Sequence, residues 1–184
     1  CGQTKAAALL LDHSADVNAK TDEGGHWDGG TPLCLAVDQD KHAMAKLLLD
    51  HGADPFVKFD YGETLLHKAV WCHGTAMLEL LLAHKLDVNA KTEHGQETAL
   101  HNAAFSGYIE TVNFLLDHGA DINAGVETPI FQAAERGELK AAELLRRRGA
   151  KLDFITEIRL DRRDDVAAAL KRDPKLVENQ HRCT

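Results

Sequence analysis

The sequence predicts an all-α solenoid, built from helix–turn–helix units that stack side by side and carry projecting loops along one edge. Two recurring phrases predict this fold. A threonine followed by two apolar residues opens each unit, at residues 31–33, 64–66, 98–100 and 128–130. A phrase close to Asp-His-Gly-Ala-Asp-Val-Asn closes each unit, at residues 12–18, 50–54, 84–89 and 117–123. Because each such unit contacts only its neighbours, the repeats are expected to form one continuous body.

The unit at residues 98–124 shows how these phrases frame a pair of helices. Small apolar residues recur at helical spacing as far as Ala104, and the Ser-Gly step at residues 106–107 then interrupts them. Larger apolar residues follow at the same spacing from Ile109 to Leu116, and Gly119 stands where a helix end is expected. Two helices joined by a glycine turn form an αα-hairpin, whose alanines allow neighbouring helices to approach closely.

The four openers are spaced by 33, 34 and 30 residues, and two of them continue to a histidine, His67 and His101. A period near 33 with an opener similar to Thr-Pro-Leu-His is the pattern of ankyrin repeats. Over nearly its whole length the chain resembles an ankyrin-repeat protein. The resemblance implies a single ankyrin-repeat array over residues 1–184, with units at residues 1–20 (partial), 21–58, 59–91, 92–124, 125–153 and 154–184 (divergent and partial).

Taken in order, the other units predict helices at residues 2–11, 32–39, 42–50, 65–72, 76–84, 129–136 and 139–148. Proline opens the helices at residues 32 and 129, where no intrahelical hydrogen bond is lost. Lys85 replaces the expected glycine, so a non-glycine residue is predicted to adopt the left-handed conformation there. Beyond Asp153 the pattern weakens, and a short divergent unit is expected before Pro174.

Composition and charge narrow the classes of function. The net charge is −8; residues 1–130 hold 8 basic and 19 acidic residues, whereas residues 131–184 hold 13 and 10. This overall acidity argues against general nucleic-acid binding. No apolar run reaches the ~18 residues of a membrane span, and no secretory signal is visible. The four cysteines lack Cys-x-x-Cys spacing, which predicts a reducing, intracellular and cytoplasmic setting. We expect a monomer.

The loops between units, here called fingers, shorten along the chain from 11 residues before Thr31 to 3 residues before Thr128. The ankyrin resemblance implies that these fingers form β-hairpins, and that partners meet the finger tips and the inner ends of the first helices along a concave face. The finger tips supply Trp27, Asp28, Asp60, Tyr61, Glu63, His94, Gln96, Glu97 and Glu127. The first-helix ends supply Asp38, Gln39, Trp71, Cys72, Phe105, Ser106, Glu135 and Arg136.

Trp71 and Phe105 stand at positions that are expected to be exposed to solvent. Either they bind an apolar anchor of a partner, or they pack on one another or against the fingers. Aromatic residues beside acidic ones suit a protein partner with an apolar anchor and basic residues. At the other end of the array, residues 146–148 are three arginines. They either complement the helix dipole on a solvated face or contact an acidic partner.

Chemistry at a metal or a catalytic centre is not predicted. His13, His51, His84 and His118 recur once per unit, but helices pack about 10 Å apart, whereas zinc requires donors within about 2.3 Å. Each is expected instead to cap the end of its helix. No nucleophile–base–acid set and no glycine-rich phosphate loop emerges, so no cofactor and no enzyme activity are expected within these residues.

Two functional hypotheses follow from the resemblance. The first is a non-catalytic recognition module that holds another protein on its concave face. The alternative is the target-binding arm of a larger enzyme or bacterial effector whose catalytic domain lies outside this chain. Because the repeat pattern begins and ends within a unit, we expect the chain to be a piece of a longer array.

Overall fold

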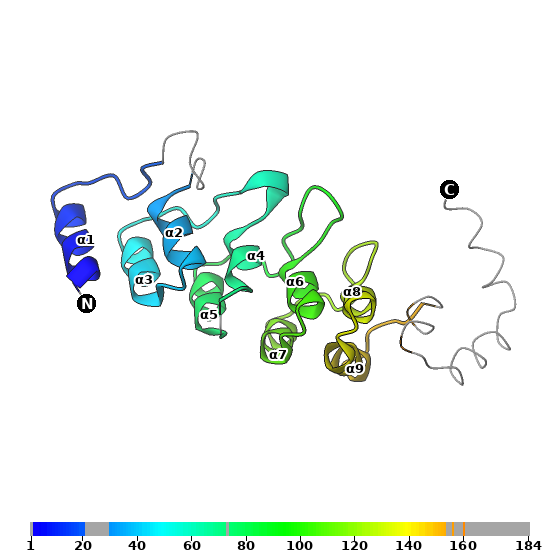
Figure 1. Cartoon of the computed structure of the whole chain (residues 1–184). Helices are drawn as coiled ribbons and strands as arrows, with labels where there is room; N and C mark the ends of the chain where they lie inside the picture. The colour runs from blue at the N-terminus through cyan, green and yellow to red at the C-terminus, as the bar shows by residue number, and fades with distance from the viewer. Residues whose placement is uncertain (1, 21–29, 73, 154–155, 157–159, 161–184) are drawn as a thin grey trace, which may run out of the picture.

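The computed structural model describes residues 2–20, 30–72, 74–153, 156 and 160 of the 184-residue chain. Helices occupy most of these residues and form two rows that run along an elongated stack (Figure 1). The row of first helices contains α2 (Pro32–Asp38), α4 (Leu65–Ala69), α6 (Ala99–Phe105) and α8 (Pro129–Arg136). The row of second helices contains α1 (Gly2–Asp12), α3 (His42–Asp50), α5 (Ala76–Ala83), α7 (Ile109–Asp117) and α9 (Leu139–Arg147). The first helices lie between the second helices and the fingers (Figure 1). The predicted all-α solenoid is confirmed.

The opening threonines begin the first helices as the sequence predicts. At α4, the backbone N–H of Thr64 donates to Nδ1 of His67 at 3.1 Å, and the two side chains also meet at 2.9 Å. This reciprocal capping box satisfies donors that a helix start would otherwise leave open. Where Cys34 replaces the histidine, its N–H donates to Oγ1 of Thr31 at 3.4 Å. The threonine cap therefore persists in α2 without the imidazole.

The ends of the second helices also follow the repeated phrases. Nδ1 of His13, His51 and His118 each donates to the backbone carbonyl four residues earlier, at 2.8 Å. These histidines therefore cap helix ends, as expected. Lys85 has φ of 66°, so the residue that replaces glycine does adopt the left-handed conformation. A β-carbon at such a φ is strained.

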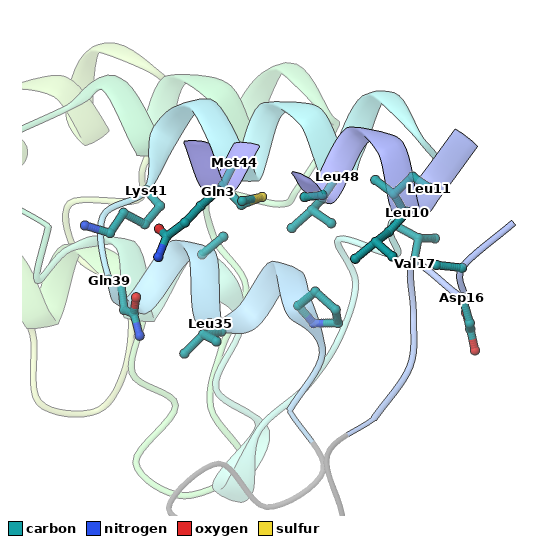
Figure 2. A pocket seen from close by; sticks show the side chains of 14 residues that line it. Gln3, Leu10, Leu11, Asp16, Val17, Leu35, Gln39, Lys41, Met44 and Leu48 are labelled. Carbon is teal, nitrogen blue, oxygen red and sulfur yellow. The ribbon is translucent and has the colours of Figure 1, made fainter. Parts of the chain in front are cut away.

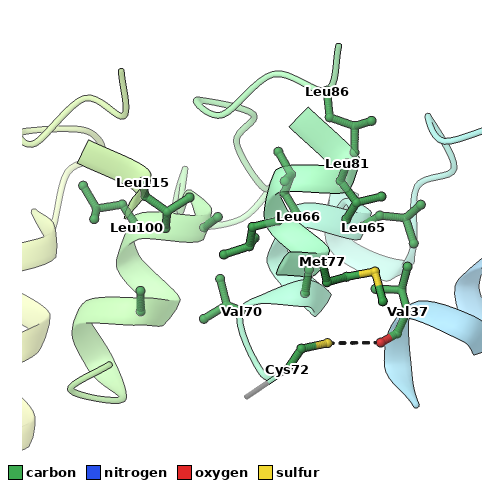
Figure 3. Packing of buried hydrophobic residues seen from close by; sticks show 14 of the residues in the cluster. Val37, Leu65, Leu66, Val70, Cys72, Met77, Leu81, Leu86, Leu100 and Leu115 are labelled. Carbon is green, nitrogen blue, oxygen red and sulfur yellow. Dashed lines mark hydrogen bonds between the residues drawn. The ribbon is translucent and has the colours of Figure 1, made fainter. Parts of the chain in front are cut away.

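The core lies between the two rows of helices, where apolar residues of successive units form one cluster (Figure 3). Alanines at equivalent positions of the first helices are buried: Ala36, Ala69, Ala103 and Ala133. Large residues fill the spaces between helices, including Leu66, Leu81 and Leu100, which are all at most 1% exposed. Because neighbouring units share this cluster, each helix pair depends on the next for burial.

Two expectations are corrected. The fingers are not β-hairpins in the part of the chain described: the only pairing between extended segments there is an isolated bridge from Lys58 to Thr64. The finger of residues 58–64 instead contains a short 3₁₀ turn, η1 (Asp60–Gly62). The helix predicted at residues 65–72 ends at Ala69, because the N–H of Trp71 and of Cys72 bond three residues back and tighten the chain.

Some expectations lie outside the described residues. The first finger, with Trp27 and Asp28, is among them, and so is nearly all of the divergent unit expected at residues 154–184.

Candidate functional site

The inner ends of the first helices place aromatic residues at the surface of the middle of the stack. Trp71, directly after α4, is 49% exposed. Its ring meets that of Tyr108, at the start of α7, edge to face, with centroids 6.3 Å apart and planes at 82°. Tyr108 is 37% exposed. The two rings belong to adjacent units, so their contact forms an aromatic ridge that bridges the two units while much of each ring faces solvent.

Phe105 occupies the position in α6 that Trp71 occupies one unit earlier. The guanidinium carbon of Arg136, at the end of α8, lies 4.3 Å from the centroid of the Phe105 ring. This is a cation–π contact between adjacent units. Phe105 keeps 38% of its surface exposed. The sequence predicted both residues for the face but not that they would touch.

A third pair lies at the finger tips. The rings of Tyr61 and His94 have centroids 5.4 Å apart, and Tyr61 is 67% exposed. The N–H of Glu93 donates to the carbonyl of Tyr61 at 2.7 Å, which ties the two fingers together. Tyr61 has φ of 61°, a left-handed backbone that interrupts the short 3₁₀ turn. The fingers therefore present an aromatic side chain from a fixed backbone.

Several predicted acidic and polar residues are occupied by contacts within the array. Glu63 forms a salt bridge with Lys68, whose ammonium also lies 5.2 Å from the centroid of the Phe59 ring. Oε1 of Glu97 accepts a hydrogen bond from Nε2 of Gln132 at 2.7 Å. Lys68 offsets the charge of Glu63, and Gln132 occupies one oxygen of Glu97, so both carboxylates are already engaged within the array.

The finger backbones are anchored by the two buried histidines. Nε2 of His67 donates to the carbonyl of Glu97 at 3.1 Å, and Nε2 of His101 donates to the carbonyl of Glu127 at 2.9 Å. Each imidazole accepts at Nδ1 and donates at Nε2, so both are neutral. Burial lowers the pKa of both histidines, against the opposing effect of the carbonyl bonds. They hold each finger to the preceding first helix.

Cys72 does not belong to the exposed face. It is only 6% exposed, and its thiol donates to the carbonyl of Val37 at 3.2 Å (Figure 3). Burial, with a further contribution from the charge of Asp40, raises the pKa of this thiol to about 11. The side chain turns inward because the tightened turn after α4 directs it towards the neighbouring unit.

The remaining predicted residues are of two kinds. Ser106 is half-buried, and its Oγ is buried without a hydrogen-bond partner in the described part of the chain. The others have exposed side chains: Asp38, Gln39, Asp60, Gln96, Glu127 and Glu135. Sequence reasoning missed Tyr108, although this residue directly follows the Ser-Gly step that ends the first helix.

The three arginines near the end of α9 are paired. Arg146 and Arg147 bond the carboxylate of Glu143, and Arg148 bonds Asp117 of α7. The hydrogen bonds from Arg146 and Arg147 lower the pKa of Glu143 to about 2. Their position at the helix C-terminus also complements the helix dipole.

A cavity of about 440 Å³ lies at the N-terminal end of the stack, beside α1, α2 and α3 (Figure 2). Its lining comes from α1, α2, α3 and the segments that follow α1 and α2, and it includes the apolar residues Leu10, Leu11, Leu35 and Met44. The row of second helices extends one helix beyond the row of first helices here.

The comparisons with known proteins agree with this geometry. A family model described as ankyrin repeats (3 copies) matches residues 1–92 and 90–155. The chain belongs to the ankyrin-repeat family. Ankyrin arrays generally serve to bind other proteins, and their stacked units create extended concave surfaces.

The similar proteins come from humans, a spider and a bacterium. Human transient receptor potential cation channel subfamily A member 1 is 31% identical over 157 residues, covering 83% of this chain and 14% of that protein. Alpha-latrocrustotoxin-Lt1a of Latrodectus tredecimguttatus is 33% identical over 141 residues, 75% of this chain and 10% of the toxin. A putative ankyrin repeat protein of Rickettsia bellii is 34% identical over 117 residues, 63% and 16% of the two chains. The chain thus spans a small part of the relatives that it matches.

Two further observations concern only the described residues. No group of three histidine, cysteine, aspartate or glutamate side chains there could hold a metal ion. No helix there combines the length and apolar character needed to cross a bilayer.

Proposed function

We propose that this ankyrin array is a non-catalytic recognition module that binds a protein partner on the face formed by its finger tips and first-helix ends. The observation that carries the proposal is the aromatic ridge of Trp71 and Tyr108. Rings that only completed the core would be buried, whereas Trp71 is 49% exposed. Half-exposed aromatic residues are the typical anchors of protein interfaces.

The same face indicates the chemistry of the partner. Phe105 and Tyr61 add exposed aromatic side chains to this face, and Asp38 and Asp60 add exposed carboxylates. A partner with an apolar anchor and basic residues complements this arrangement. Binding as a monomer in a reducing compartment is part of the proposal, and the free, buried thiols of Cys34 and Cys72 support the compartment.

The test selects peptides from a random 12-residue display library on the intact chain and measures their affinity for variants. Trp71→Ala is expected to weaken binding about 30-fold, or roughly 2 kcal/mol. The matched control is Phe56→Ala, because Phe56 is an aromatic residue that is more exposed, at 63%, and lies in the loop after α3. Equal affinity of the intact chain and Trp71→Ala, or a loss of folding in Trp71→Ala, would contradict the proposal.

A second candidate is that the array serves as the target-binding arm of a larger protein. The observation that favours it is that the chain spans only 10–16% of the three relatives described above. Both candidates use the same face. The complete reading frame distinguishes them, since a catalytic domain encoded in it would support the second.

A further inference from the structure

A second cavity adjoins the aromatic ridge. It has a volume of about 180 Å³ and lies between the turn after α4 and the first turn of α7. The residues that line it are Cys72, Gly74, Tyr108, Ile109, Glu110 and Thr111. Tyr108 belongs to both the cavity and the ridge, so a partner segment lying on Trp71 would pass the mouth of the cavity.

The size and lining of the cavity suit one large apolar side chain. An apolar protein cavity of about 150 Å³ accommodates benzene, which is close in size to the end of a leucine, methionine or phenylalanine side chain. The ring of Tyr108 and the side chain of Ile109 provide apolar walls, and the thiol of Cys72 is already bonded to Val37. The other polar groups among the lining residues are the carboxylate of Glu110 and the hydroxyls of Tyr108 and Thr111.

The carboxylates around the cavity specify what should flank that side chain. Glu110 is exposed at the cavity, and Asp38 and Asp40 of the preceding unit are close enough to act on the buried thiol of Cys72. Among the described residues, none of these three carboxylates forms a salt bridge. Lys41, which follows Asp40, lines the separate cavity beside α1 (Figure 2). Glu110 at the cavity, and Asp38 and Asp40 near the thiol of Cys72, thus place carboxylates of two units close to an apolar site, which favours basic groups beside an apolar anchor.

Resting on the proposed recognition function, we infer that this cavity is the anchor subsite of the face: it receives a leucine, methionine or phenylalanine of a protein partner, with lysine or arginine on either side. The flanking cations meet Glu110 at the cavity and the carboxylates of Asp38 and Asp40 near Cys72. Trp71 and Tyr108 pack against the partner backbone that links the apolar anchor to its basic neighbours.

The repeat itself offers a variant that fills the subsite. Thr111 occupies the position that Met77 occupies in α5 and Met44 in α3, so the fold already accepts methionine there. Thr111→Met is therefore expected to remain folded while its longer side chain enters the cavity. Glu110→Gln removes the charge at the edge without changing its size. Folding of both variants is checked by circular dichroism and thermal unfolding.

The probe is a synthetic peptide, Gly-Ser-Lys-Arg-Leu-Arg-Lys-Ser-Gly, titrated into ¹⁵N-labelled chain and followed by amide chemical shifts. The matched control peptides replace leucine with alanine, or the four basic residues with glutamine. We expect the leucine peptide to shift signals of residues 72, 74 and 108–111 and to bind at least ten-fold more tightly than either control. Thr111→Met is expected to weaken it at least ten-fold, and Glu110→Gln two- to five-fold.

The outcomes separate the subsite from the wider proposal. No binding of the leucine peptide at millimolar concentration overturns the subsite. Binding that survives Thr111→Met, or that shifts only the finger signals, also overturns it and leaves recognition by the face intact. The subsite is supported if Thr111→Met no longer binds the peptides selected from the library and the leucine peptide gives the expected chemical-shift changes.

Discussion

Asn89 and Asp121 join two adjacent helix pairs through the side chain of one and the backbone of the other. Oδ1 of Asn89 accepts from the N–H of Asp121 at 2.7 Å, and its Nδ2 donates to the carbonyl of Gly119 at 3.0 Å. Asn18 makes the equivalent two bonds to the pair that follows it. One asparagine side chain therefore satisfies a donor and an acceptor at the end of the next second helix.

The junction between the second and third helix pairs lacks this link. Phe56 stands where Asn18 and Asn89 stand in other units, and its N–H still donates to Oδ1 of Asp54 at 2.9 Å, as in those turns. The backbone is thus the same and only the side chain differs. The groups that an asparagine would reach are the carbonyl of Lys85 and the N–H of Asp87.

Phe56→Asn is expected to stabilise the array by about 1–2 kcal/mol, because two new hydrogen bonds form and an exposed ring buries little surface in the native chain. Native-state hydrogen exchange should show slower exchange at residue 87 and closer coupling of the helix pairs on either side. Unchanged exchange there would show that the asparagine does not reach across.

Asn89→Ala removes the link one junction later and should cost about 1–2 kcal/mol in the free energy of unfolding. The expected loss is local, with faster amide exchange at Asp121 and no change at Asp54, whose N–H is bonded by Asn18. Measurement is by urea unfolding together with hydrogen exchange. A uniform loss across all units would contradict a link that acts at one junction.

Acid should weaken the array through His67 and His101. Their pKa is lowered in the folded state by burial, so the unfolded chain takes up protons first as pH falls. Their contribution is complete above the ordinary pKa of about 6.5 and is lost as pH falls below it, by up to about 1.4 kcal/mol per histidine per pH unit. Urea unfolding at pH 7.5 and 5.5 measures this difference.

The control for the pH effect is the double variant His67→Cys and His101→Cys, which copies the cysteine that the chain itself carries at Cys34 in the equivalent turn of α2. It should be less stable at pH 7.5 but should lose less stability between pH 7.5 and 5.5. An equal loss in both proteins would assign the effect to other groups.

Gly125 and Gly119 form a matched pair for substitution by alanine. Both have positive φ, 79° and 87°, so both variants carry backbone strain of about 1–2 kcal/mol. A β-carbon on Gly125 would also lie 2.9 Å from Nε2 of His101, whereas one on Gly119 meets nothing within 4 Å. Because His101 is held by Thr98 and Glu127, Gly125→Ala should cost about 1–3 kcal/mol more than Gly119→Ala in urea unfolding. Equal costs would show that the imidazole moves aside freely.

Most of the fold could be predicted from the sequence because its signals are local. The helix at Pro129–Arg136 was predicted to the residue, and the left-handed Lys85 and the capping roles of His13, His51 and His118 were also correct. These features depend on residues within one turn of one another. The finger strands were wrongly expected, since strand pairing requires a ladder between two segments and the finger of residues 58–64 makes a single bridge.

The candidate face could be predicted only in part. The repeat register placed Trp71, Phe105 and Tyr61 at the surface, but it did not show that Cys72 turns inward or that Glu63 and Glu97 are already bonded. The contacts of Cys72 with Val37 and of Glu97 with Gln132 join residues of different units that are 35 residues apart in the sequence. The partner of Glu63, Lys68, lies in the same unit, but the sequence alone does not show that the two side chains meet.

By itself, the sequence determined the repeating helix pair, its caps and the order in which the pairs stack, because these follow from spacing and from short-range hydrogen bonds. The tertiary structure decided that Tyr108 meets Trp71, that Arg136 covers Phe105 and that a cavity opens beside them. The physical reason is that each of these depends on how one unit is rotated against the next, which is fixed by the packing of the shared core.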